Sequence, residues 1–409
     1  MITAKGRAYL AGGVLALLAG VVAGSAALAA AGVLFLSALL VAGLLRRDLS
    51  ISVRRSVQPQ RLREGEWVDV DLAVANSGTT AGFLEVAETL SERLELSGKA
   101  REMLALRPRE TAALRYRLRA HVKGVYSVGP LAYRVEDVFG LFAEDLQHPE
   151  EAYFTAIPGS DDAEVEAKSR IPKGYLGEHI VRSPGQGMEF FGLREYVRSD
   201  PLKEVNWKAS ARAGELIVNQ RERESITDVA VFYDCRAASG RGTATVNGNV
   251  LGARAVASML EILLARRDRM KFVSYGPRVD VVQPDTGDRM RHKVLNLLSA
   301  LEPAGDTRLL QAVEAVLPTL SRQTPVIVVS NLEEDASVVE AVSRLRAREL
   351  NVLVLSPRAH FPTADASVVE LAAAERAAVV AALRAAGARV LDWDPQASFS
   401  IAMAKGALL

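Results

Sequence analysis

The sequence predicts a multi-domain protein in which a transmembrane helical hairpin precedes a β-sandwich and then a doubly wound α/β domain. Three observations predict this class: an uncharged apolar run near the N-terminus, alternating apolar and polar residues after it, and strand patterns that alternate with helical ones in the second half. At 409 residues, the chain is too long for one ordinary domain. We expect the parts to be residues 1–47, 48–157, a charged segment 158–224, the α/β domain 225–400 and a tail 401–409.

The apolar run extends from Ala8 to Leu45, which is 38 residues without an Asp, Glu, Lys, Arg or His. A helix needs about 20 apolar residues to cross a bilayer, and about 17 at the lower end. The run therefore fits two spans, near Ala8–Ala23 and Ala26–Leu45, with a turn at Gly24-Ser25.

Basic residues flank this run on both sides, Lys5 and Arg7 before it and Arg46 and Arg47 after it. By the positive-inside rule, both ends of the hairpin and the soluble domains are expected on the cytoplasmic side of the cell membrane. Two alternatives stay open, a cleaved signal peptide and a single tilted span. A signal peptide has an apolar region of about 7–15 residues, and the continuing run at 34–45 exceeds that pattern.

The next part of the chain alternates apolar and polar residues, as in Leu49–Val53, Trp67–Val74 and Ala113–Ala120. This period of two places the apolar side chains on one face of a half-buried strand. Turn residues such as Asn76-Ser77-Gly78 and Arg107-Pro108-Arg109 separate the strings. Many short strands without a long helical pattern predict a β-sandwich of the immunoglobulin-like kind.

The second half alternates strands with helices, which predicts a parallel, doubly wound sheet. The expected strands are Asp228–Tyr233, Lys271–Tyr275, Pro325–Ser330, Val352–Leu355 and Arg389–Asp392. The expected helices are Gly252–Arg267, Arg289–Leu301, Thr307–Leu320, Ser337–Glu349 and Val368–Ala385. Open sheets of this type bind ligands at the carboxyl ends of their strands. Asp234, Ser330 and Asn331 are expected there.

Composition excludes several classes of function. The 50 basic residues balance the 49 acidic ones, which argues against a dedicated nucleic-acid binder. The single cysteine, Cys235, excludes a disulfide framework within one chain and a multi-cysteine zinc site. The sequence lacks a G-x₄-GK[ST] loop, so we expect no ATP hydrolysis by a P-loop mechanism. The pair Gly185-x-Gly187 lacks a strand-to-helix phosphate turn and is expected to be a flexible loop.

The stretch Gly187–Arg212 combines charges of both signs with aromatic residues. The residues singled out for a structural or partner-binding role are Glu189, Arg194, Tyr196, Asp200, Trp207, Lys208 and Arg212. Such residues form charge-assisted hydrogen bonds and Arg–aromatic contacts. One interpretation is an ordered cross-link to the α/β domain. The other is a surface that binds a partner.

The stretch resembles the hallmark of the DUF58 family, G-x-E-F-x-x-L-R-x-Y-x-x-G-D-x-x-R-x-I-x-W-K-x-S-A-R. It departs from that pattern at Ser199, Lys203 and Val205. Upstream, residues 123–130 and 137–142 resemble the strand pair that the family writes as RG-x-Y-x-x-GP and DPFGLF. The resemblance implies a membrane protein that works with a MoxR-type AAA+ ATPase in the assembly or maturation of other proteins. It implies no established catalytic activity.

The α/β half resembles a von Willebrand factor A domain, a family that holds a divalent cation with a D-x-S-x-S loop, a Thr and a later Asp. Here Asp234 keeps the carboxylate, whereas Arg236 and Ala238 replace the two serines. Thr307 matches the Thr position, and the later Asp position falls at Ser330-Asn331. Mg²⁺ prefers carboxylate, hydroxyl and water oxygens. We therefore expect no cofactor and no tightly bound metal at this degenerate site.

The expected function is that of a membrane-anchored, non-enzymatic scaffold or adaptor that binds protein partners. A metal-dependent adhesion module is the first alternative, and it would need the missing hydroxyl ligands. An enzyme that uses the Cys235 thiol is the second alternative, although no neighbouring His or carboxylate in the sequence activates that thiol. The client protein and the oligomeric state have no sequence signal.

Overall fold

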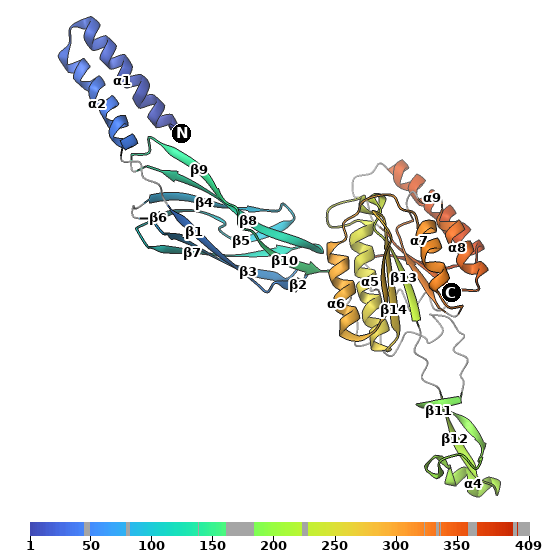
Figure 1. The fold of residues 1–409 in the computed structure, drawn as a ribbon. Helices are drawn as coiled ribbons and strands as arrows, with labels where there is room; N and C mark the ends of the chain where they lie inside the picture. Colours follow the sequence, from blue (N-terminus) through green and yellow to red (C-terminus); the bar gives the residue numbers. More distant parts are fainter. Residues whose placement is uncertain are drawn as a thin grey trace. The chain divides into compact units, whose positions relative to one another are not determined.

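The structure is a computed structural model, and its element order is drawn in Figure 1. The residues that it describes are 1–44, 50–78, 82–137, 139–160, 184–222, 228–322, 324–332, 335, 337–358, 366–395 and 399. They belong to two compact units, Met1–Ile157 and Pro158–Leu409. Each unit has its own arrangement.

The chain begins with two apolar helices, α1 (Ala4–Ala23) and α2 (Ala26–Leu44), which confirms the prediction of an N-terminal helical pair. Gly24 ends α1 in the left-handed conformation at a φ of 61°, which glycine adopts without strain. Gly20 lets the helices approach, because a Cβ there would lie 2.4 Å from the Ala29 nitrogen. Both helices are long and apolar enough to cross a membrane. Their length and composition therefore indicate a membrane anchor.

A third helix, α5 (Gly248–Ala265), is also long and apolar enough to cross a membrane. Most of its residues are buried inside the second unit, whereas α1 and α2 expose most of theirs. Because its apolar surface is covered by protein, α5 is a core helix.

Two β-sheets make up the rest of the first unit. Their strands are β1 (Ile51–Gln58), β2 (Arg61–Arg63), β3 (Trp67–Asn76), β4 (Gly82–Leu90), β5 (Leu94–Gly98), β6 (Arg101–Leu106), β7 (Thr111–Ala120), β8 (Gly124–Glu136), β9 (Ala143–His148) and β10 (Ala152–Ile157). One sheet has the order β1-β3-β7-β5, and the other has the order β2-β10-β8-β4-β6 with β9 also paired to β8. Val70, Leu84, Leu118 and Phe154 share one core that both sheets line. The predicted β-rich region is thus a two-sheet sandwich.

A buried ion pair joins the two sheets of the sandwich. Arg55 of β1 donates from Nη2 to both carboxylate oxygens of Glu88 in β4, at 2.9 and 3.0 Å. The two side chains are only 4% and 0% exposed. Burial raises the pKa of Glu88, and the bonds from Arg55 oppose that rise.

A six-stranded sheet forms the centre of the second unit. Its strands are β13 (Asp228–Asp234), β14 (Arg269–Tyr275), β15 (Asp280–Asp285), β16 (Val326–Val329), β17 (Val352–Pro357) and β18 (Arg389–Trp393), in the order β15-β14-β13-β16-β17-β18. Five of them are parallel, as predicted. The edge strand β15 is antiparallel to β14 and was not predicted. Its side chains alternate between partly buried and exposed, so its apolar pattern is weak.

Helices cover both faces of this sheet (Figure 1). Besides α5, they are α6 (Gly287–Ala300), α7 (Leu309–Val316), α8 (Val338–Ala347) and α9 (Ala366–Ala385). Phe232 and Val328 of the sheet pack with Val313 of α7, Val342 of α8 and Leu383 of α9 in one core. Every residue of β16 is buried, as the predicted continuous apolar strand requires.

A small element of the second unit lies at residues 184–222, between the sandwich and the α/β part in sequence, and we call it the hairpin module. It consists of β11 (Pro184–Glu195), a short 3₁₀ turn (Leu202–Glu204), α4 (Trp207–Ala213) and β12 (Ile217–Glu222), which pairs antiparallel with β11. The expectation of a flexible loop at Gly185-x-Gly187 is wrong, because both glycines lie in β11.

Candidate functional site

A bidentate ion pair fixes the turn of the hairpin module that follows β11. Arg194 donates from Nη1 and Nη2 to the two carboxylate oxygens of Asp200, at 2.6 and 2.5 Å. The backbone N–H of Val197 donates to the same carboxylate at 2.9 Å. The bonds from Arg194, and then the bond from Val197, lower the pKa of Asp200 below its ordinary value. The planar guanidinium fork suits this geometry.

A second polar group joins α4 to β12. The side chain of Asn206 caps α4 by accepting from the Ala209 N–H at 3.0 Å, and its amide donates to Asn219 of β12 at 2.9 Å. Ser210 in α4 accepts from the Ile217 N–H at 2.8 Å. These bonds satisfy polar groups at the helix start and the strand start, so they order a module that has little apolar core.

The apolar side chains of the module point mostly outward. Val205 and Val218 are buried, whereas six other apolar side chains are exposed. They are Phe190, Leu193, Val197, Leu202, Trp207 and Leu216, with exposures between 39% for Leu216 and 64% for Trp207. All six side chains belong to one small element of the described chain. We call these six residues the apolar surface of the module.

The residues singled out from the sequence take different places in the module. Arg194 and Asp200 form the ion pair, and Tyr196 is half-buried with its N–H bonded to the Leu216 carbonyl. Trp207, Lys208 and Arg212 are exposed on α4. The backbone of Glu189 lies in β11, and its side chain is outside the described part. Among described residues, the side-chain bonds of the segment stay within 184–222.

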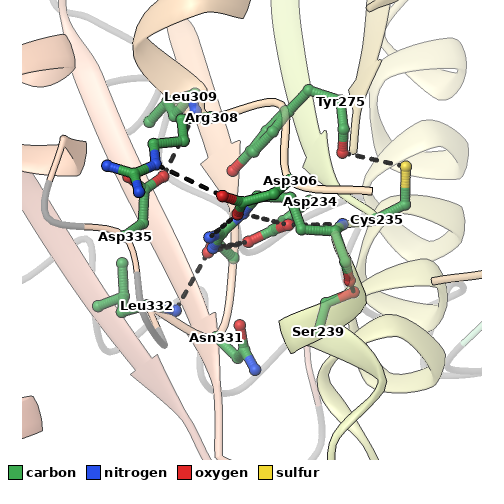
Figure 2. Close-up of polar contacts among 12 residues, drawn as sticks. Asp234, Cys235, Ser239, Tyr275, Asp306, Arg308, Leu309, Asn331, Leu332 and Asp335 are labelled. Carbon is green, nitrogen blue, oxygen red and sulfur yellow. Dashed lines mark hydrogen bonds and ion pairs between the residues drawn. The ribbon is translucent and has the colours of Figure 1, made fainter. Parts of the chain in front are cut away.

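The carboxyl edge of the sheet contains the second candidate site, a buried ion pair (Figure 2). Arg236 donates from Nε and Nη2 to the Asp234 carboxylate at 3.1 and 2.9 Å, and its backbone N–H donates to the same group at 3.0 Å. The two side chains are 0% and 1% exposed. Burial opposes the charge on Arg236, but the bonds to Asp234 outweigh it and raise the pKa of Arg236.

Side chains from later loops complete this pair. Ser330, directly after β16, donates to Asp234 Oδ2 at 2.7 Å and accepts from the Leu332 N–H at 3.1 Å. Asp306 lies 3.8 Å from Arg236 Nη1 and is mostly exposed. Asp234 and Ser330 therefore meet at the carboxyl edge, as the strand pattern predicts.

Thr307 and Asn331, the other residues predicted at this edge, are not bonded to Asp234 in the described part of the chain. The Thr307 N–H donates to the Gly276 carbonyl at 2.8 Å, and in the described part of the chain no bond joins its hydroxyl to Asp234. Asn331 is buried, and both polar atoms of its side-chain amide are without a partner among the described residues. In the described ranges, no group of three His, Cys, Asp or Glu residues could hold a metal.

A divalent cation does not fit at Asp234. The carboxylate already accepts four hydrogen bonds, three from Arg236 and one from Ser330, and a carboxylate has about four acceptor positions. A metal at these oxygens would also lie against the guanidinium. Arg236 thus supplies the positive charge that a metal would bring.

Cys235 is fully buried beside this pair, and its thiol donates to the Tyr275 carbonyl at 3.1 Å (Figure 2). A nucleophilic thiol has to be reachable by a substrate. The described surroundings therefore favour a structural role for Cys235.

Comparison with known proteins gives one family match. The family model described as "Protein of unknown function DUF58" matches residues 192–390. This range contains most of the hairpin module and most of the α/β part. No curated protein matches the chain in sequence.

Solved structures show only weak likeness. Proximal thread matrix protein 1 from the mussel byssus is 15% identical, over 45% of this chain and 46% of that one, with a TM-score of 0.30. Native α2-macroglobulin from Escherichia coli is 19% identical, over 27% of this chain and 17% of that one, with a TM-score of 0.24. A FixG-related protein from Vibrio parahaemolyticus is 16% identical, over 27% and 98%, with a TM-score of 0.19. Such low TM-scores carry no argument about function.

The match begins inside β11, two residues before Arg194, and ends in β18. It therefore includes the ion pair of the hairpin module and the buried pair at the sheet edge. The match to the DUF58 model over residues 192–390 supports the family resemblance that the motif between the two large parts predicts.

Proposed function

We propose that this chain is a membrane-anchored, non-enzymatic scaffold or adaptor, and that its hairpin module binds a protein partner. The apolar surface of the module is the observation that supports this most directly, because ordered large apolar groups are exposed there. Trp207 is the expected centre, since Trp is enriched among residues that dominate binding energy.

The charge of the module favours a protein partner over a polyanion. Residues 184–222 contain six basic and six acidic side chains. A nucleic-acid site or an anionic lipid site would call for a basic excess. Balanced charge around apolar anchors is the composition of a protein–protein interface.

The proposed partner class is a MoxR-type AAA+ ATPase, with the soluble domains on the cytoplasmic side. The DUF58 match supports this, together with the resemblance of the chain to that family along its length. The strand order β15-β14-β13-β16-β17-β18 supports a von Willebrand A-like assignment of the α/β part. The two-sheet sandwich supports an immunoglobulin-like assignment.

The geometry at the carboxyl edge of the sheet counts against the two alternative functions, a metal-dependent adhesion module and an enzyme that uses Cys235. A metal-dependent adhesion module needs free oxygens at Asp234, and those oxygens are bonded to Arg236 and Ser330. An enzyme that used Cys235 would need access to a thiol that is fully buried.

The test is binding of a purified MoxR-type ATPase to the full chain in detergent, with and without ATP. Replacing Trp207 by Ala should cost about 2 kcal/mol of binding, roughly a thirty-fold rise in Kd. Leu371 of α9 is the matched control, because it is 62% exposed and Trp207 is 64% exposed. Leu371→Ala should bind like the wild type. Equal affinity of Trp207→Ala and Leu371→Ala would exclude the module as the docking surface.

A further inference from the structure

The loop between β8 and β9 is tied to the start of the membrane anchor. Three consecutive carbonyls of the loop accept hydrogen bonds from the N-terminus of the chain. Lys5 Nζ donates to Phe139 O at 2.9 Å, the Thr3 hydroxyl to Gly140 O at 2.7 Å, and the Thr3 N–H to Leu141 O at 3.0 Å. The N-terminal amine donates to the Ala143 carbonyl at 2.6 Å. The loop and the start of α1 are therefore one ordered structure.

Packing fixes the same loop against both helices. Leu141 is 1% exposed and forms a small core with Leu39 and Ala42 of α2. Gly6 of α1 lies so close that a Cβ there would be 2.3 Å from the Leu141 carbonyl oxygen. The loop thus contacts the helical pair at the end where α1 begins and α2 ends.

The described residues of the loop also bond to one another. The Asp137 carboxylate accepts from the Phe142 N–H at 2.6 Å and from the Phe139 N–H at 3.1 Å. Gly140 adopts a φ of 65°, which permits the tight turn. The backbone of Phe139 is therefore held at its N–H and at its carbonyl.

The length of α1 gives the depth of this loop in a membrane. Its 20 residues span about 30 Å at 1.5 Å per residue, close to the thickness of the hydrocarbon core. The α1–α2 turn then lies at one membrane surface, and Lys5 lies at the other. A Lys ammonium cannot enter the core cheaply and stays near the headgroups. Phe139, whose carbonyl accepts from Lys5, lies at the same depth.

Phe139 leaves its aromatic ring 47% exposed at this depth, although its neighbour Leu141 is buried. Phe83 is a second exposed aromatic residue, 52% exposed, and it pairs with Glu136 at the same end of the sheet. Exposed aromatic side chains and a lysine at one depth are typical of the boundary between headgroups and acyl chains.

We propose that the β8–β9 loop is a membrane contact in its own right, in which the Phe139 ring enters the phospholipid interface beside the Lys5 ammonium. Together with α1 and α2, the loop gives the sandwich a third point of attachment to the bilayer. This attachment sets the height of the sandwich above the membrane. The inference depends on the membrane anchor and is independent of the protein partner proposed for the hairpin module.

The test uses the full chain in bilayer nanodiscs of phosphatidylcholine and phosphatidylglycerol. A Cys235→Ala background removes the native thiol, and single cysteines then carry an environment-sensitive fluorophore. The sites are Phe139→Cys, Tyr153→Cys and Leu34→Cys. Tyr153 is the matched control, because it is 58% exposed and pairs with Ser127, roughly 30 Å along β8 from Glu136 at about 3.4 Å per residue. Leu34 reports insertion of α2.

The label at position 139 should shift its emission to the blue and lose intensity when doxyl groups are placed near the lipid headgroups. The label at position 153 should keep the spectrum that it has in water. The label at position 34 should be quenched by doxyl groups deep in the acyl chains. A water-like spectrum at 139 together with deep quenching at 34 would overturn the proposal. A water-like spectrum at 34 would remove the membrane anchor and the proposal with it.

Discussion

The hairpin module and the carboxyl edge of the α/β sheet use the same chemical pair in opposite ways. At the edge, Arg236 and Asp234 are buried and bond to each other, and Asp234 also accepts from Ser330. In the module, Arg194 and Asp200 brace a turn near the surface, and the large apolar side chains face outward. Open α/β sheets ordinarily bind ligands at the carboxyl edge. Here the charges at that edge are bonded to each other, and the large exposed apolar side chains lie in the module, where we propose the binding surface.

The two pairs also differ in what they contribute to stability. Removing one partner of a buried ion pair leaves the other charge buried and uncompensated. This costs about 3–5 kcal/mol of folding stability. A pair near the surface is screened by water and contributes far less. The edge pair should therefore govern the folding of the α/β part, whereas the module pair should govern the shape of a binding surface.

The largest loss of stability is expected from a substitution at the carboxyl edge of the sheet. Arg236→Met leaves the Asp234 carboxylate buried without its cation and should lower the free energy of unfolding by about 3–5 kcal/mol. Urea unfolding of the full chain in detergent, followed by circular dichroism, measures this loss. The double variant Asp234→Leu/Arg236→Met should lose less than Arg236→Met alone, because it leaves no buried charge. Wild-type stability of Arg236→Met would show that the pair is not essential to the edge.

The next test asks whether Arg236 stands in for a metal. The variant Arg236→Ser/Ala238→Ser restores a D-x-S-x-S loop and leaves Asp234 open. Saturating Mn²⁺ or Mg²⁺ should stabilise this variant, by about 2.7 kcal/mol when the free ion is at 100 times its Kd. The wild type should show no change in melting temperature with either ion. Stabilisation of the wild type by these ions would contradict the conclusion that Arg236 and Ser330 occupy the oxygens of Asp234.

The carboxyl edge could be predicted from the sequence to a large extent. The apolar strands that precede Asp234 and Ser330 are strong patterns, and parallel strands bring their carboxyl ends together. The replacement of a hydroxyl by Arg236 was also visible as a cation beside a carboxylate. The sequence does not show that the Arg236 side chain bonds to the carboxylate of Asp234, two residues earlier, and occupies its acceptor positions.

The exposed apolar residues and the short helix of the hairpin module could not be predicted from the sequence pattern. The exposed Phe190 and Leu193 resemble core residues of a strand, because apolar periodicity does not say whether a face is covered. Helix α4 has seven residues, which is too short for a clear helical period. The antiparallel edge strand β15 was missed for a related reason, since a half-exposed strand has only a weak apolar pattern.

Within the module, substitutions at Arg194 and Trp207 distinguish a loss of local order from a loss of partner binding. Arg194→Ala removes both bonds to Asp200 and should loosen the turn at Val197, so partner binding should weaken by less than the thirty-fold expected for Trp207→Ala. Arg194→Lys keeps the charge but loses the bidentate fork and should give an intermediate result. Hydrogen exchange of the Val197 amide should speed up in both Arg194 variants and stay unchanged in Trp207→Ala. Faster exchange in Trp207→Ala would mean that the ring also holds the turn.

The smallest effect concerns pH. The bonds from Arg194 and Val197 hold the pKa of Asp200 below its ordinary 3.8. A carboxylate with a lowered folded pKa stabilises the structure fully above its unfolded pKa, and the contribution is lost as pH falls through the folded value. The Val197 amide, corrected for its intrinsic exchange rate, should therefore keep its protection down to about pH 3.8 and lose it below.

The variant Asp200→Asn is the control for this pH effect, because its amide does not titrate in the same range. It should show weaker protection of Val197 with no step between pH 5 and pH 2. A step that persists in Asp200→Asn would assign the titration to another carboxylate. A wild-type step centred at the ordinary 3.8 or higher would mean that Arg194 does not hold the Asp200 carboxylate in solution. The turn at Val197 would then lack the ion pair that orders it.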